Sequence, residues 1–322
     1  MTKRWLDRLD GLPRGLPFTT ATARSAGLSY QALSYLTRAG ALRRPVAGVY
    51  VDAAVPDTIS MRCDVVRLVV PPDCFICDRT AAWLHAGDRA LGPGEHLAVP
   101  ALCCFRPSDG GRLRNSLTDS GEREIAPHDL MQLHGLTVTT PLRTALDLGR
   151  LQPTRDLRLH GMDSMLGLGA FGHDELLAEV PRFNRRRGVV LLRVLAPLAD
   201  PGSQSFGESA LRLRWYDAGL PAPRTQIPVV VGERVLYYID MGLEELGIGA
   251  EYDGEAWHSS PEQREHDTVR RAHLIDVERW QIEVFRREHV FGHHQDADLR
   301  LKRLAESAQS QLRLRRLGIA RD

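Results

Sequence analysis

The stretch Tyr238-Ile239-Asp240, followed by Glu251-Tyr252-Asp253, decides how we interpret this chain of 322 residues. Each acidic group follows a run of apolar and aromatic residues that is typical of a β-strand. Asp and Glu are depleted in strands, so acids at the ends of two successive strands need a physical reason. Because strand side chains alternate between faces, Glu251 and Asp253 should share a face, and a neighbouring strand can bring Asp240 to about 5 Å from them.

Carboxylates held this close repel one another and resist ionisation unless a cation neutralises them. Mg²⁺ suits such a place, because it prefers one or two carboxylates with water and phosphate oxygens completing its shell. The pattern therefore favours a Mg²⁺ site at Asp240 and Glu251, open to Mn²⁺ as a substitute and used in phosphodiester chemistry. In the alternative, Asp240 caps a turn and Glu251 pairs with Arg270 or Arg271.

The residues around this stretch predict a mixed α/β domain over 202–322, which begins after the breaker-rich link Gly202-Ser203-Gln204. Leu211 and Trp215, four residues apart, indicate a helix before the sheet. The expected order is a helix over 205–219, a hairpin of strands 227–231 and 235–240, a strand over 248–252, a helix over 262–279, a strand over 281–286 and a helix over 299–317.

A family resemblance rests on Tyr238-Ile239-Asp240, on Glu251-Tyr252-Asp253-Gly254-Glu255-Ala256-Trp257-His258, and on Asp267-x-x-Arg270 with Leu274. These motifs resemble the PD-(D/E)XK nuclease superfamily, in its branch similar to the very-short-patch repair endonucleases. The resemblance implies a restriction-endonuclease-like fold, a mixed sheet flanked by helices. It also implies that Asp240 and Glu251 bind Mg²⁺ and that Glu208, on the helix before the sheet, completes the metal shell.

One position departs from the superfamily, whose motif lysine would fall where this chain has Asp253; all but two of the 42 basic residues are arginine, and neither lysine is near. We expect Asp253 to tune or extend the metal shell. His258 stands at the spacing seen in the repair-endonuclease branch, and an imidazole that titrates near neutrality can accept a proton from water. In the alternative, His258 is structural and pairs with Glu262 or Asp267.

The N-terminal residues predict a winged helix over 1–56. A short helix from Thr20 to Ala26 is followed by a turn, a second helix between Ser29 and Gly40, and two strands around a basic turn over 41–51. In such a module the second helix enters the major groove of DNA and the wing meets phosphates. The predicted DNA-binding residues are Tyr30, Gln31, Ser34 and Arg38 on the helix, with Arg43 and Arg44 on the wing. The alternative is a helical hairpin that packs on the rest of the chain or binds protein.

The middle region, 57–201, reads as a mixed α/β scaffold with helices over 79–85 and 139–148. Arg185-Arg186-Arg187 is either a nucleic-acid contact or a solvated loop. The first 200 residues resemble the winged-helix and linker region of type IV abortive-infection antitoxins. The cues are Gly48-Val49-Tyr50 and Thr80-Ala81-Ala82-Trp83-Leu84.

Composition bounds the class of protein. The chain has 42 basic and 41 acidic side chains, so any nucleic-acid surface must be local. The 43% hydrophobic content is typical of an ordinary globular protein. Cys74-x-x-Cys77 and Cys103-Cys104 lack the paired spacing of a zinc site, and we expect reduced, buried thiols. The start resembles no signal peptide and no long apolar run follows, so we expect a cytoplasmic protein without a membrane partner.

Two functions remain. In the first, the chain is a metal-dependent DNA endonuclease acting in DNA repair or phage defence. In the second, it is a DNA-binding transcriptional regulator or antitoxin-like protein, with a protein partner and an inactive nuclease-like domain. Retention of all three strand-end acids favours the first, and the missing lysine favours the second.

Overall fold

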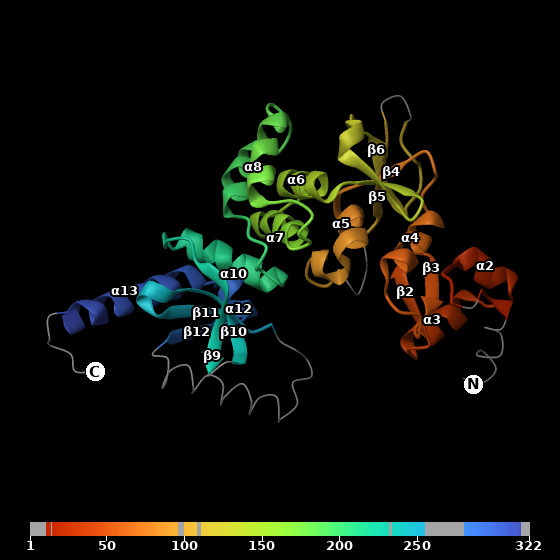
Figure 1. Ribbon diagram of the computed structural model, residues 1–322. Helices are drawn as coiled ribbons and strands as arrows, with labels where there is room; N and C mark the ends of the chain where they lie inside the picture. Colours follow the sequence, from red (N-terminus) through yellow and green to blue (C-terminus); the bar gives the residue numbers. More distant parts are fainter. Residues whose placement is uncertain are drawn as a thin grey trace.

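The computed structural model describes residues 11–13, 15–95, 100–107, 111–231, 234–254 and 280–316. They form a mixed α/β protein with three separate β-sheets. In Figure 1 the N-terminal elements and the C-terminal sheet lie at opposite ends, with the middle region between them. The predicted α/β class is therefore confirmed, and the three domain boundaries stay predictions.

The N-terminal elements follow the predicted order of helix, turn, helix and hairpin. Ser29 begins the second helix, because its Oγ accepts the backbone N–H of Ala32 (3.2 Å), and Gly40 follows the helix with a φ of +73°. A short strand before the first helix was not predicted; it completes an antiparallel sheet of order β1-β3-β2. The elements are β1 (Phe18–Thr19), α2 (Thr20–Ser25), α3 (Tyr30–Arg38), β2 (Leu42–Val46) and β3 (Val49–Asp52).

The middle region combines a five-stranded mixed sheet with a group of helices. The sheet has the order β6-β5-β4-β8-β7, with β5–β6 and β4–β8 parallel. Its strands and their neighbouring helices are α4 (Ile59–Arg67), β4 (Phe75–Ile76), α5 (Asp78–Ala86), β5 (Leu102–Arg106), β6 (Thr118–Glu122), β7 (Leu130–Leu133) and β8 (Leu136–Thr139). The helices that follow are α6 (Pro141–Leu151), α7 (Arg155–Leu166), α8 (His173–Glu179) and α9 (Val189–Leu195). Both predicted helices are present, as α5 and α6.

The C-terminal sheet has the order β12-β11-β10-β9, in which β11 and β12 are parallel and the other neighbours antiparallel. Its elements are α10 (Phe206–Asp217), β9 (Arg224–Val231), β10 (Arg234–Leu243), β11 (Ile248–Tyr252), β12 (Gln281–Phe285), α12 (Arg287–Val290) and α13 (Ala297–Arg316). The predicted hairpin, third strand and last helix are confirmed, but the strand expected to end at Asp240 continues to Leu243, because residues 241–243 pair with β11. The helix predicted over 262–279 lies outside the described residues.

Separate apolar cores hold these regions together. In the C-terminal region, α10 and α13 pack on one side of the sheet, where Trp215, Met241 and Leu301 are fully buried (Figure 1). All five cysteines are buried and carry free thiols. Within the described ranges, no helix combines the length and apolar character needed to cross a membrane.

A buried ion pair joins the middle region to α10. Arg212 Nη2 donates to Asp163 Oδ2 on α7 (2.5 Å), and both side chains are almost fully buried. Arg212 also donates to the Ser203 hydroxyl (3.1 Å) and to the carbonyl of Leu198. The first helix of the C-terminal region is therefore fixed by a charge that the middle region neutralises.

Candidate functional site

Asp240 joins β10 to the end of β11. It lies within β10, which continues to Leu243, and not at the strand end expected from the sequence. The two strands pair from Leu243 and Ile248 to Met241 and Ala250. Just beyond the last pair, the backbone N–H of Tyr252 donates to Asp240 Oδ2 (2.8 Å). The Asp240 carboxylate is therefore bonded to the residue that follows Glu251. The predicted adjacency of the two acidic strands is confirmed.

Glu251 lies in the interior of the sheet. Its side chain is 7% exposed, and β11 runs between β10 and β12, with Glu251 opposite Val284. A carboxylate in such a position requires compensation by a proton, a cation or hydrogen-bond donors. Arg270 and Arg271, the alternative partners expected from the sequence, lie outside the described residues.

Glu208 lies in the first turn of α10. Ser205 Oγ accepts its backbone N–H (3.1 Å), and Glu208 Oε2 accepts the backbone N–H of Gln204 (2.8 Å). The amide of Gln226 also donates to Glu208 Oε2 (3.4 Å). Burial raises the pKa of Glu208, although the Gln204 and Ser205 hydrogen bonds act against this rise. Glu208 therefore stabilises the start of α10 whether or not it binds a metal.

Gly207 and Gln226 bring Glu208 to the end of the sheet. A Cβ at Gly207 would lie 2.0 Å from the ring of Tyr252, so only glycine lets α10 approach β11 this closely. Gln226, which bonds Glu208, lies opposite Asp240, between the register pairs Ile227–Ile239 and Thr225–Met241. These contacts thus place the start of α10 beside β9 and β11.

Asp253 lies one residue beyond β11. Its backbone N–H donates to the Phe285 carbonyl (2.8 Å), and its carboxylate pairs with Arg286 Nε (3.4 Å) at a half-exposed position. Asp253 therefore has a cation beside it. His258, the predicted proton acceptor, lies outside the described residues.

The chemistry of this donor set fits Mg²⁺. Carboxylate oxygens are its usual protein ligands, and it commonly takes only one or two of them. Asp240 and Glu251 would supply these two, from neighbouring strands. Among the residues that the structure describes, no group of three or more His, Cys, Asp or Glu side chains is arranged to hold a metal ion.

The predicted DNA-binding side chains lie on one helix and one strand. Tyr30 (65% exposed), Gln31 and Arg38 of α3 are exposed, and Ser34 is half-buried. Arg44, in β2, is exposed, whereas the guanidinium of Arg43 donates to the carbonyl of Val55. Arg44 is therefore better placed than Arg43 to meet a phosphate.

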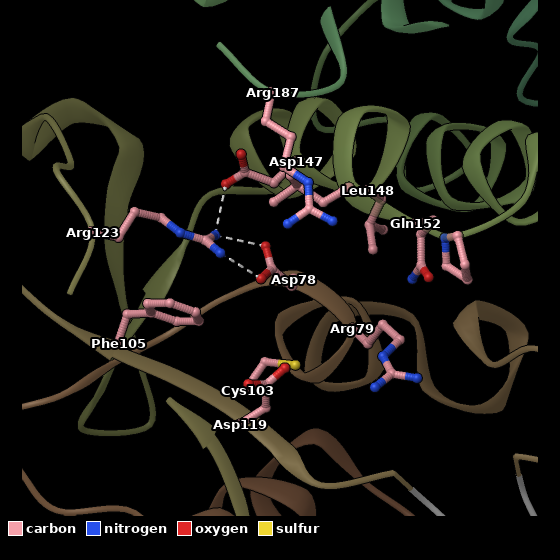
Figure 2. Close-up of a pocket in the computed structure, with 12 residues that line it drawn as sticks. Asp78, Arg79, Cys103, Phe105, Asp119, Arg123, Asp147, Leu148, Gln152 and Arg187 are labelled. Atoms are coloured by element: carbon pink, nitrogen blue, oxygen red, sulfur yellow. Dashed lines mark hydrogen bonds and ion pairs between the residues drawn. The ribbon is translucent and has the colours of Figure 1, made fainter. Parts of the chain in front are cut away.

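Sequence reasoning missed a charged cavity in the middle region. Figure 2 shows Arg123 between Asp78 and Asp147. Its Nη atoms donate to both carboxylate oxygens of Asp78 (2.7 Å each), and Nη1 lies 3.3 Å from Asp147 Oδ2. These partners are 45 and 24 residues away in sequence, so no local spacing indicates them.

Comparisons with known proteins identify relatives. No protein-family model matches the chain. The chain is similar to "Uncharacterized protein MT2308" of Mycobacterium tuberculosis (strain CDC 1551 / Oshkosh) and to "Uncharacterized protein Rv2248" of the same species (strain ATCC 25618 / H37Rv). Each is 29% identical over 250 residues, which is 78% of this chain and 88% of the relative. A solved structure, "Crystal structure of RV2827C protein from Mycobacterium tuberculosis", is similar at a TM-score of 0.30 and 17% identity, over 62% of this chain and 78% of that one.

Proposed function

We propose that this protein is a metal-dependent DNA endonuclease that hydrolyses phosphodiester bonds. The observation that carries the proposal is the bond from the Tyr252 N–H to Asp240, which joins β10 to the end of the neighbouring strand β11 beside the buried Glu251. Carboxylates on adjacent strands, one half-buried and one buried, suit a divalent cation and a phosphate. The PD-(D/E)XK resemblance supports the same reading.

Each side chain of the site would have a separate role in catalysis. Asp240 and Glu251 would hold Mg²⁺, with Glu208 completing the shell and Mn²⁺ able to replace Mg²⁺. The ion would supply charge stabilisation and lower the pKa of water. His258 would accept the proton of the attacking water, and Arg286, beside Asp253, would face the phosphate charge.

Cleavage of plasmid DNA tests this function. The full chain is incubated with supercoiled plasmid and Mg²⁺, or with Mn²⁺, and in parallel with a chelator. We expect nicked or linear DNA only when the metal is available. If the purified protein leaves the plasmid intact across both metals and a range of pH, the endonuclease proposal fails.

DNA affinity is proposed to come from a winged helix formed by α2, α3 and the β2–β3 hairpin. Replacing Arg44 with Ala should weaken binding to unrelated duplexes and lower the salt slope by about 0.9, the value for one lost phosphate contact. Arg43→Ala is the matched comparison, and its slope should change less because its guanidinium bonds to Val55. Equal slopes for wild type and Arg44→Ala would count against this assignment.

The second candidate is a DNA-binding regulator or antitoxin-like protein that binds a protein partner and does not cleave. It is favoured by position 253, where an aspartate paired with Arg286 replaces the lysine of the superfamily. Sequence-specific DNA binding that persists in chelator, together with an intact plasmid, would select this function.

A further inference from the structure

A cavity of about 470 Å³ lies in the middle region, between the segment that follows β6, the helix α6 and the basic run before α9. We call it the arginine cleft. Arginine is its commonest lining residue, and acidic residues are half as frequent. The charged residues that line it are Arg123, Arg143, Arg150, Arg182, Arg186 and Arg187, with Glu122, Glu124 and Asp129.

The inner arginines of the cleft hold the fold together. Arg143 donates hydrogen bonds to Asp129 (2.6 Å) and to Asp147 (2.8 Å). Arg150 donates to Asp147 (2.8 Å), and Arg182 donates to Asp129 (2.8 Å). Burial acts to raise the pKa of Asp129, but Arg182 and Arg143 outweigh it, so the pKa is lowered and the carboxylate stays ionised. These pairs fasten α6 to the segments around it, which is a structural role.

The rim of the cleft has guanidinium groups that the fold does not use. Among the described residues, Arg187 has no side-chain ion pair or hydrogen bond, and Arg186 bonds only the exposed Glu124 (2.7 Å). An exposed pair of this kind contributes little to stability. In the wall, Arg150 is 8% exposed, and within the described structure its Nε is a buried donor without an acceptor. The cleft therefore has more donors than acceptors.

The basic run Arg185-Arg186-Arg187 is fixed and is not a loose loop. Arg185 and Gly188 both have a positive φ, of 64° and 79°. A Cβ at Gly188 would lie 1.9 Å from the Arg150 carbonyl oxygen, and Arg150 Nη1 donates to the Arg187 carbonyl (2.9 Å). The backbone of the run is thus held against α6. The side chains at the rim are therefore attached to a fixed backbone, which reduces the conformational entropy lost on binding.

An adjoining cavity of about 440 Å³ shares Arg123 and Arg187 with the cleft. Figure 2 shows both guanidinium groups directed into it, with Arg123 beside Phe105. Arg123 lies 4.1 Å from the Phe105 ring centroid and is held by Asp78, which has the rare φ of +51° for a non-glycine residue. Backbone strain of this kind is concentrated at functional sites.

We propose that the arginine cleft binds a phosphate group, with Arg186 and Arg187 as the residues that contact it. Guanidinium groups match phosphate oxygens in charge and in their paired N–H geometry. The cavity volume lies in the range of small-molecule sites. The phosphate belongs either to a free phosphorylated compound or to a nucleic-acid backbone, and the proposal is independent of the endonuclease function.

Calorimetric titration of the full chain tests the site with two probes, pyrophosphate and a short DNA duplex. In Arg186→Gln/Arg187→Gln the Kd of at least one probe should rise about 10- to 100-fold, as expected for the loss of two hydrogen bonds of ordinary strength at exposed positions. A loss with pyrophosphate identifies a free phosphorylated ligand, and a loss with the duplex alone identifies the backbone.

Arg185→Gln is the matched control, because Arg185 is adjacent and exposed but does not line either cavity. It should bind like the wild type, and unfolding temperatures should agree among all variants. Arg187→Lys keeps the positive charge but loses the paired N–H groups of the guanidinium. Its Kd should lie between those of the wild type and the double variant. The proposal is overturned if neither probe loses affinity in the double variant, or if Arg185→Gln loses as much.

Discussion

Acidic side chains have different surroundings in the middle region and at the C-terminal sheet. In the middle region, Asp129, Asp147 and Asp163 each accept hydrogen bonds from arginine side chains. At the sheet end, Glu208 accepts neutral N–H groups from Gln204 and Gln226, and Asp240 accepts the N–H of Tyr252. Arginine charges thus contact the acids of the middle region, whereas neutral N–H groups contact Glu208 and Asp240; Asp253, beside them, pairs with Arg286.

This difference distinguishes the acids that stabilise the fold from those that suit a ligand. Removing one partner of a buried ion pair leaves an uncompensated charge and is strongly destabilising. A carboxylate held by neutral donors keeps a negative charge that a cation can still complete. Neutralising an acid should therefore cost stability in the middle region and activity at the sheet end.

The largest effect is expected for Asp240→Asn. Asn keeps the shape and can accept the Tyr252 N–H, so the variant should fold and bind DNA. Its Mg²⁺-dependent cleavage should fall by roughly a thousandfold or more, because the metal supplies both charge stabilisation and the activated water. Plasmid cleavage and thermal unfolding measure the two properties. Wild-type cleavage by Asp240→Asn would remove Asp240 from the site.

His258→Ala tests a residue outside the described structure and should have the next effect. Cleavage should fall by about 10² to 10⁴, the loss typical of one general base. Wild-type activity should rise through roughly pH 6 to 7 as the imidazole becomes neutral, and this acidic limb should move in the variant. An unchanged rate and pH profile would make the histidine structural.

The ion pair between Arg212 and Asp163 should affect stability only. Arg212→Met leaves Asp163 buried without its cation, so the free energy of unfolding should fall by about 3 to 5 kcal/mol. Replacing both, as Asp163→Leu/Arg212→Met, should recover most of this loss. Urea unfolding of the wild type and the two variants gives the comparison. A single variant as stable as the wild type would show that the pair does not fix α10.

Local signals explain why much of the fold could be predicted from the sequence. Ser29 and Ser205 cap their helices, and the segment 248–252, which follows Gly247 with its φ of +63°, forms β11. Strand β1 has only two residues and depends on its pairing with β3, so no local pattern indicated it.

The two candidate sites also differ in how far the sequence predicts them. The proximity of Asp240 and Glu251 could be predicted because neighbouring strands bring them together over a short sequence distance, although Asp240 lies within β10 and not at its end. The arginine cleft could not be predicted, because it depends on contacts such as Arg182 with Asp129, 53 residues apart. The sequence marked Arg185-Arg186-Arg187 only as a charge run, and its fixed backbone depends on the contact of Gly188 with Arg150.

The smallest expected effect concerns Glu208 and tests its share in the metal shell. Burial raises the pKa of Glu208 in the folded state, so folding favours the protonated form. Its contribution to stability is complete below the unfolded pKa and is lost as pH rises through the higher folded pKa. Glu208→Gln is neutral at every pH, so without metal it should become the more stable protein as pH rises.

Added Mg²⁺ turns this small difference into a test of the site. If Glu208 contacts the ion, Mg²⁺ stabilises the ionised wild type by mass action but stabilises Glu208→Gln less, so the order of stability reverses near neutral pH. Unfolding curves at two pH values, with chelator and with Mg²⁺, measure this. Glu306→Gln, an exposed neutralisation on α13, is the control and should show neither effect. A Mg²⁺ response that is the same in wild type and Glu208→Gln would leave Glu208 as a helix-capping residue and confine the metal site to Asp240 and Glu251.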